Sequence, residues 1–151
     1  MSTSTIRQAG LADIDGLALM FDEYRQFYGR PTDFKAAKEF LVARFNHGES
    51  VLFLATVSGE PAGFVQLYPS FSSVSLARTF ILNDLFVTNS FRRQGIAQRL
   101  LAAATSYAQA VGAIRLTLST ATNNTEAQSL YKTSGWKRDD QFFVYHLSPL
   151  A

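Results

Sequence analysis

The sequence contains no cysteine, and this absence excludes disulfide bonds, a thiol nucleophile and thiolate metal sites. Its two histidines, His47 and His146, lie far apart along the chain without a carboxylate cluster at metal-ligand spacing, so we expect no metal. No apolar run approaches the roughly 20 residues that a membrane-spanning helix needs. The first residues also do not lead into the apolar core of a signal peptide. We therefore expect a cytoplasmic protein with no membrane partner.

Basic residues are sparse as well. The formal net charge is +2, and Arg92-Arg93 and Lys137-Arg138 are the only adjacent basic pairs. A nucleic-acid-binding surface usually carries a denser basic stripe, so we expect no nucleic-acid partner. What the sequence has in quantity is apolar: 47% of its 151 residues are hydrophobic, and 13 are phenylalanine. This composition predicts a single domain over residues 1–151 with one substantial core.

Apolar periodicity predicts an α/β chain of the mixed α+β kind. Helices are expected at residues 13–28, 33–45, 94–110 and 126–133, the first of them capped by Asp13. Strands are expected at residues 4–8, 51–57, 62–68, 77–87, 114–118, 136–138 and 142–147. Hairpins come first and strand–helix–strand units follow, which predicts a twisted, mostly antiparallel mixed sheet of about seven strands with helices on both faces.

A short basic segment, residues 92–97 (RRQGIA), follows the apolar run 80–87 and opens an amphipathic helix. The first N–H groups of a helix have no intrahelical partner, and the helix dipole favours negative charge there. Glycine at position 95 allows a phosphate to approach the backbone. The segment therefore predicts an anion site, although a solvated surface turn would show the same pattern.

A second segment, residues 124–136 (NTEAQSLYKTSGW), opens a short helix that Asn124 is suited to cap. Together the two segments resemble the GNAT N-acetyltransferases. The first is similar to that family's acetyl-CoA loop, R/Q-x-x-G-x-G/A, at Arg92, Gly95 and Ala97. The second resembles its N-x-x-A-x-x-L-Y-x-x-x-G-F/W element, which is matched by Asn124, Ala127, Leu130, Tyr131, Gly135 and Trp136.

The resemblance extends over essentially the whole chain, and it implies a sheet whose fourth and fifth strands splay apart to admit acetyl-CoA. Tyr131 matches the tyrosine that protonates the departing thiolate in this family. Acetyl-CoA is the expected co-substrate, and the residues implied to bind it are Leu85, Phe86, Val87, Arg92, Arg93, Gln94, Gly95, Ile96, Ala97, Asn124, Ala127 and Lys132.

The run at residues 82–87 (LNDLFV) resembles the fourth strand of the polyamine and diamine acetyltransferases and of the yeast-type histone and D-amino-acid acetyltransferases. Polyamine enzymes of this group have a glutamate base where this chain has Asn83, and an amide cannot accept that proton. Asp84 is retained and is the second expected catalytic residue, because a charge inside an apolar run is costly unless it is used. The alternative is a carboxylate that satisfies nearby backbone at a strand irregularity.

By the same resemblance, residues of the first helix and of the strands at 62–68 and 77–87 are expected to line the acceptor side. Acids beside aromatic rings could receive a cationic amine, although two of these acids could equally form the solvated face of the helix. The loop at residues 69–75 is expected to contribute as well. The residues expected to bind the acceptor are Asp22, Glu23, Tyr24, Tyr28, Tyr68 and Asn83.

The sequence thus predicts an N-acetyltransferase in which a primary amine attacks acetyl-CoA directly in a ternary complex, since no residue is an obvious acyl carrier. The acceptor is expected to be a small amine: a polyamine, a diamine, an amino acid or its analogue. The alternatives are a protein lysine acetyltransferase and a catalytically silent CoA-binding sensor. A homodimer is expected by analogy with the family.

Overall fold

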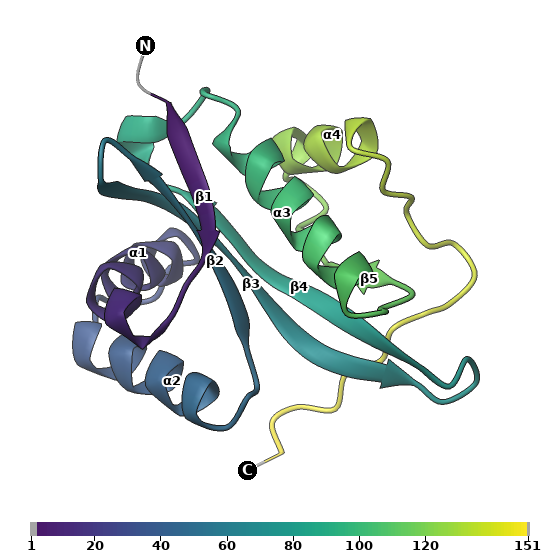
Figure 1. Cartoon of the computed structure of the whole chain (residues 1–151). Coiled ribbons are helices and arrows are strands. Elements are labelled where there is room, and N and C mark those ends of the chain that lie inside the picture. The colour runs from purple at the N-terminus through teal and green to yellow at the C-terminus, as the bar shows by residue number, and fades with distance from the viewer. Residues whose placement is uncertain (1–2, 151) are drawn as a thin grey trace. The chain divides into compact units, whose positions relative to one another are not determined.

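The computed structural model describes residues 3–150, which divide into two compact units on either side of the bond between Ser119 and Thr120. The first unit contains the whole sheet, and the second contains one helix and the C-terminal segment (Figure 1). The elements of the first unit are β1 (Ser4–Gln8), α1 (Ile14–Phe27), α2 (Phe34–Asn46), β2 (Val51–Val57), β3 (Glu60–Ser72), β4 (Ala77–Val87), α3 (Ile96–Ala110) and β5 (Leu116–Thr117), with 3-10 turns at Leu11–Asp13 and Asn89–Phe91. The second unit has α4 (Thr125–Thr133).

The sheet has the order β1-β2-β3-β4-β5. The first four strands pair antiparallel and β5 pairs parallel with β4, which confirms the expected mixed, mostly antiparallel sheet. A two-residue turn joins β2 to β3, with Ser58 at φ 52° and Gly59 at φ 82°. Positive φ at both central positions produces the twist that a tight hairpin requires.

Helices cover both faces of this sheet: α1 and α2 lie on one face and α3 on the other (Figure 1). On the first face, Phe21 and Tyr24 of α1 pack edge-on against Phe64 of β3. On the second face, Tyr107 of α3 packs against Phe53 of β2 and also against β4. Apolar side chains therefore alternate between two cores along each central strand.

One irregularity breaks that alternation. In the pairing of β3 with β4, Gln66 lies opposite Asp84 and the next residue, Leu67, lies opposite Leu82, so that Asn83 is an extra residue in β4. Phe80, before this bulge, packs against Tyr107 of α3, whereas Phe86, after it, packs against Tyr24 of α1. The bulge thus moves Asp84 and Phe86 to the face that α1 and α2 cover.

Several element bounds differ from those expected. β3 continues to Ser72, so that residues 70–72 belong to the strand and only residues 73–76 form the turn. Backbone pairing with residues 77–79 makes this extension possible despite its polar side chains. Helix α3 begins at Ile96 rather than Gln94, because Gly95 at φ 76° is not helical. Ile96, Leu100, Ala104 and Ala108 form its buried face, as expected of an amphipathic helix.

The expected closing strands are wrong. Within the described part of the chain, residues 136–150 contain no strand, which leaves five strands where about seven were expected. Large apolar side chains of this segment are exposed, including Phe143 at 89%. A strand requires a hydrogen-bonding neighbour, and the second unit has only α4 as regular structure among its described residues. Apolar alternation along the chain was therefore insufficient.

Candidate active site

Asp84 is a buried carboxylate, with 3% of its surface exposed. Its Oδ2 accepts a hydrogen bond from Gln66 Nε2 at 2.5 Å, and its Oδ1 accepts one from Asn83 Nδ2 at 3.0 Å. Burial raises the pKa of Asp84 above its usual value, and the neutral donors around it only partly oppose this rise. None of the ion pairs among the described residues involves Asp84. The carboxylate therefore has hydrogen-bond donors but no cationic partner within the described chain.

Gln66 and Ser50 complete a buried polar chain with Asp84. Gln66 has no exposed surface, and its Oε1 accepts a hydrogen bond from Ser50 Oγ at 2.6 Å. Neither residue was among those expected from the sequence. The available signal was a glutamine in the middle of the apolar run 62–68, which is the same kind of signal that singled out Asp84.

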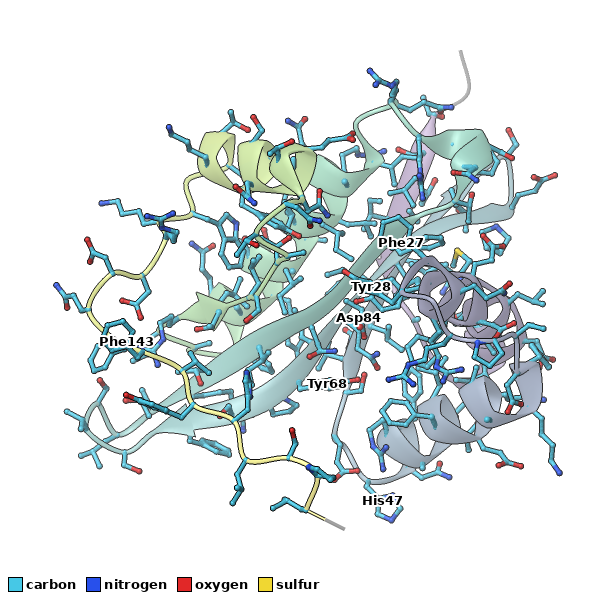
Figure 2. The ribbon with its side chains drawn as sticks, turned by 180° about the vertical axis from the view of Figure 1, so that it is seen from behind. Phe27, Tyr28, His47, Tyr68, Asp84 and Phe143 are labelled. Carbon is cyan, nitrogen blue, oxygen red and sulfur yellow. The ribbon has the colours of Figure 1, made fainter. Side chains whose placement is uncertain are left out.

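Two half-buried tyrosines, Tyr24 and Tyr68, flank the carboxylate. The Tyr24 hydroxyl donates to the Asn83 carbonyl at 3.4 Å, next to Asp84 in the chain. Burial and, after it, the negative charge of Asp84 raise the pKa of both hydroxyls, so that each tyrosine keeps its proton. Tyr28, 59% exposed, packs edge-on against Tyr24 with the ring centroids 5.1 Å apart. In the view of Figure 2, Asp84 lies between Tyr28 and Tyr68.

The two acids expected on the acceptor side, Asp22 and Glu23, differ in their exposure to solvent. Glu23 is exposed, but Asp22 is only 6% exposed, so the solvated helix face considered for it is wrong. Its carboxylate accepts hydrogen bonds from Thr32 Oγ1 at 2.5 Å and Asp33 N at 2.8 Å. These bonds, the Asp33 backbone first, lower the pKa of Asp22. Asp22 thus fastens the end of α1 to the start of α2, and we do not include it in the acceptor site.

The edge of β4 facing β5 is largely open. β5 pairs only with Phe80 and Ile81, so the stretch of β4 from Leu82 to Val87 has no strand on that side within the described residues. This separation is the splay that the family resemblance implied. Open backbone N–H and C=O groups at such an edge can pair with an extended ligand that carries amides of its own.

The basic loop at residues 92–97 comes after β4 and the 3-10 turn Asn89–Phe91. Arg92 Nε donates to the Val87 carbonyl at 2.9 Å, and its guanidinium lies over the Phe86 ring. Gly95 is the N-cap of α3 in the left-handed region, and a Cβ added there would meet nothing within 4 Å. The side chain of Ile96 is buried, so this residue can offer a ligand only its backbone N–H.

The start of α3 has the geometry of an anion site. The first bond from the helix to its N-cap joins Arg99 N to the Gly95 carbonyl, so the N–H groups of residues 96–98 have no intrahelical acceptor. Open space at Gly95, free N–H groups and exposed Arg93 and Gln94 suit a diphosphate.

The second unit carries the remaining expected residues. Asn124 caps α4 as expected: its side chain accepts a hydrogen bond from Ala127 N at 3.1 Å. Tyr131 is half-buried within this unit, and its ring centroid lies 6.0 Å from that of Trp136. Lys132 is exposed in the last turn of the helix.

Residues 3–150 contain no group of three or more His, Asp or Glu side chains that could hold a metal ion. Over the same described range, no helix combines the length and apolar character needed to cross a membrane.

The model of the acetyltransferase (GNAT) family matches residues 17–136. The chain belongs to this family, and it is an acetyl-CoA-dependent N-acetyltransferase.

The particular relatives agree with this assignment. An uncharacterized N-acetyltransferase of Bacillus subtilis is 47% identical over 95% of this chain and 96% of its own length. The crystal structure of a probable acetyltransferase, 42% identical, superposes with a TM-score of 0.91 over 97% of this chain and 98% of that chain. An aminoglycoside N-acetyltransferase in complex with CoA, 21% identical, has a TM-score of 0.80 over 97% and 96% of the two chains, and at that identity it shows the fold alone.

Proposed function

We propose that this chain transfers the acetyl group of acetyl-CoA to a small primary amine, which attacks the thioester directly in a ternary complex. The observation that carries the proposal is the environment of Asp84. A buried carboxylate that meets only neutral donors is electrostatically incomplete, and an ammonium group of an acceptor would supply the missing charge. Free lone pairs on both carboxylate oxygens can accept its protons.

The surroundings of Asp84 suit a small cationic acceptor. Tyr24 and the more exposed Tyr28 present ring faces and edges to a cation, Tyr68 lies near the same charge, and Asn83 is exposed beside it. A polyamine, a diamine, an amino acid or an analogue of one fits these groups. Protein lysine acetylation remains the alternative within the class.

The proposed proton transfers use Asp84 and, by the family resemblance, Tyr131. Asp84 accepts the proton that converts the bound ammonium into a neutral amine, and its raised pKa makes it a stronger base than an exposed aspartate. The amine nitrogen then bonds to the thioester carbonyl carbon, the carbon–sulfur bond breaks, and the second nitrogen proton passes to water as the amide forms. Tyr131 gives its hydroxyl proton to the departing thiolate and is reprotonated from water.

The proposed acetyl-CoA site uses the open edge of β4 and the start of α3. Backbone groups of Leu85, Phe86 and Val87 would pair with the pantetheine amides. The loop from Arg92 to Ala97 would hold the diphosphate. By the family resemblance, Asn124, Ala127 and Lys132 are also proposed to bind acetyl-CoA.

We also include a homodimer in the proposal. The exposed apolar side chains of the C-terminal segment, Phe142, Phe143, Val144, Tyr145 and Leu147, are its support, because contiguous exposed apolar surface commonly marks an interface. Light scattering coupled to size-exclusion chromatography would give twice the 16.7 kDa chain mass for such a dimer. Elution at the monomer mass would contradict it.

The test of the function is a thiol-release assay with acetyl-CoA against polyamines, diamines, L- and D-amino acids and a lysine-rich peptide, together with calorimetric titration of CoA. Turnover on one of the small amines is expected. Turnover on the peptide alone would favour the protein lysine acetyltransferase instead. CoA binding without turnover on any acceptor would favour the sensor and contradict the proposal.

A further inference from the structure

We infer that Gln66, oriented by Ser50, is a positioning residue that holds the Asp84 carboxylate in its charged, proton-accepting state. The inference rests on the proposed function, in which Asp84 is the base. Neither Gln66 nor Ser50 would touch the acceptor; both would act through Asp84.

The three side chains form a line across the central strands. Ser50 directly precedes β2, Gln66 lies in β3, and Asp84 lies opposite Gln66 in β4. The Ser50 hydroxyl donates to Gln66 Oε1 at 2.6 Å, and Gln66 Nε2 donates to Asp84 Oδ2 at 2.5 Å. All three side chains are buried, so water does not compete for these bonds.

The direction of the Gln66 amide determines what it does to Asp84. A glutamine amide has an accepting end and a donating end, and either could face the carboxylate. With the oxygen bound to the Ser50 hydroxyl, the NH₂ group faces Asp84. The reverse orientation would place the amide oxygen against a charged carboxylate oxygen at hydrogen-bond distance, which is repulsive. The charged carboxylate therefore favours the orientation in which the NH₂ group faces it, and the Ser50 hydroxyl supports this orientation by donating to the amide oxygen.

That stabilisation opposes the effect of burial. Burial favours the protonated form of Asp84, while the Gln66 hydrogen bond favours the charged form. A base must be charged before it can accept the acceptor's proton, so the hydrogen bond extends activity toward lower pH. A purely structural role for Gln66 would change stability without moving this pH dependence.

The test compares Gln66→Met with the wild type. Methionine has a similar length and no donor, so the charged carboxylate loses its shortest hydrogen bond. The acid limb of the kcat/KM profile should move upward by about one to two pH units, since hydrogen bonds to charged groups are worth that much in pKa. The plateau above the limb should change much less. Thr79→Val is the control: it removes a buried hydroxyl from β4 and should leave the acid limb of the kcat/KM profile in place.

Ser50→Ala provides a second variant that disturbs packing less. It keeps the Gln66 donor but removes the hydrogen bond that supports the amide, so the limb should move upward by a smaller amount than in Gln66→Met, and Ser50→Thr should restore it. Carbon-13 titration of labelled aspartate carboxyls, with the Asp84 signal identified by its absence in Asp84→Asn, reports the same pKa without turnover.

The outcomes distinguish the proposed role of Asp84 as the base from the positioning role of Gln66 and Ser50. If Asp84→Asn is fully active, the proposed function of Asp84 fails. If Asp84→Asn is inactive while folded Gln66→Met and Ser50→Ala keep both the wild-type limb and the wild-type carboxyl titration, only the positioning inference fails. An upward shift in both readouts, absent in Thr79→Val, supports it.

Discussion

Gln66 of β3 and Asp84 of β4 face each other on the side of the sheet that α1 and α2 cover, and the bulge at Asn83 is the reason. With regular alternation, Asp84 would share a face with Phe80, which packs against α3. One extra residue thus separates an apolar core from a polar site on the same strand. The predictions that follow test what this arrangement does for activity and stability.

Asp84→Asn should lower kcat/KM by about 10²- to 10⁴-fold, the usual contribution of general base catalysis. The same substitution should raise the melting temperature at pH 7. The folded-state pKa of Asp84 is raised, so wild-type stability falls as pH rises from the unfolded value, about 3.9, through the raised value. The stabilising effect should therefore vanish below about pH 4. Calorimetry across pH and steady-state kinetics measure both effects.

Asp22→Asn is the matched control for Asp84→Asn, because Asp22 is also buried but has a lowered pKa. It should reduce the melting temperature at pH 7 and leave the acid limb unchanged. Unaltered activity in Asp84→Asn, or a lower melting temperature at pH 7, would contradict the assignment of Asp84.

Gly95→Asp should weaken CoA binding by at least about tenfold, because it places a negative charge where the diphosphate is proposed to bind. Gly95→Asn has the same shape without the charge, and asparagine tolerates the left-handed conformation better than most residues. Calorimetric titration should therefore give weaker binding for the aspartate variant than for the asparagine variant. Equal affinities in both variants and the wild type would remove this loop from the site.

Tyr131→Phe should lower kcat by about 10²-fold or more, the lower range for a general acid, with little change in CoA affinity. The ring contact with Trp136 does not need the hydroxyl, so α4 should remain folded. Tyr145→Phe, at an exposed position of the same unit, serves as the control and should be indistinguishable from the wild type. An unchanged kcat in Tyr131→Phe would exclude this residue from the mechanism.

Asp13→Asn should reduce stability at pH 7 and do so much less at pH 2. The Arg7 guanidinium and the Gly10 N–H hold the pKa of Asp13 at about 2, and the side-chain bonds to Arg7 are 2.7 and 2.9 Å long. Its contribution is fully present above the unfolded pKa and is lost as pH falls from about 4 toward about 2. Because Arg7 is half exposed, we expect only about 1 to 2 kcal/mol.

Urea unfolding at several pH values measures the Asp13 effect. Asp15→Asn is the comparison, because Asp15 pairs with Lys38 on the open surface and such pairs contribute about 0 to 1 kcal/mol. A loss of stability that is the same at pH 2 and pH 7 would show that Asp13 does not act through its charge.

Much of the fold was predictable from local pattern. Strands 51–57 and 77–87 have the expected bounds, because each is a mainly apolar run that ends at turn or loop residues. Helices α1, α2 and α4 lie within one or two residues of expectation, since their apolar spacing is a local signal, as are the side-chain caps Asp33 and Asn124. Asp13 was expected to cap α1, but its side chain makes no cap hydrogen bond there and binds Arg7 and the Gly10 N–H instead. The closing strands failed for the opposite reason: the pattern at residues 142–147 suits a strand but does not provide a neighbour to pair with.

The candidate site also contains residues that the sequence predicted and residues that it did not. The sequence singled out Asp84 and the loop around Gly95, because a charge in an apolar run and a glycine before a helix are both visible locally. Gln66 and Ser50 were missed, since their importance depends on lying beside Asp84 across two strands. The hydrogen bonds of Asp22 were not predicted, because its partners Thr32 and Asp33 come close to it only when the chain turns between α1 and α2.

The sequence by itself determined the family, through two spaced motifs. It also identified Asp84 as a charged residue within an otherwise apolar run. The tertiary structure alone decided which face Asp84 occupies, which amide supports it and how far β5 leaves β4 uncovered. The physical reason is that composition and periodicity act between near neighbours. Strand register, burial and the resulting pKa of Asp84 depend instead on residues as far apart in the chain as Ser50, Gln66 and Asp84.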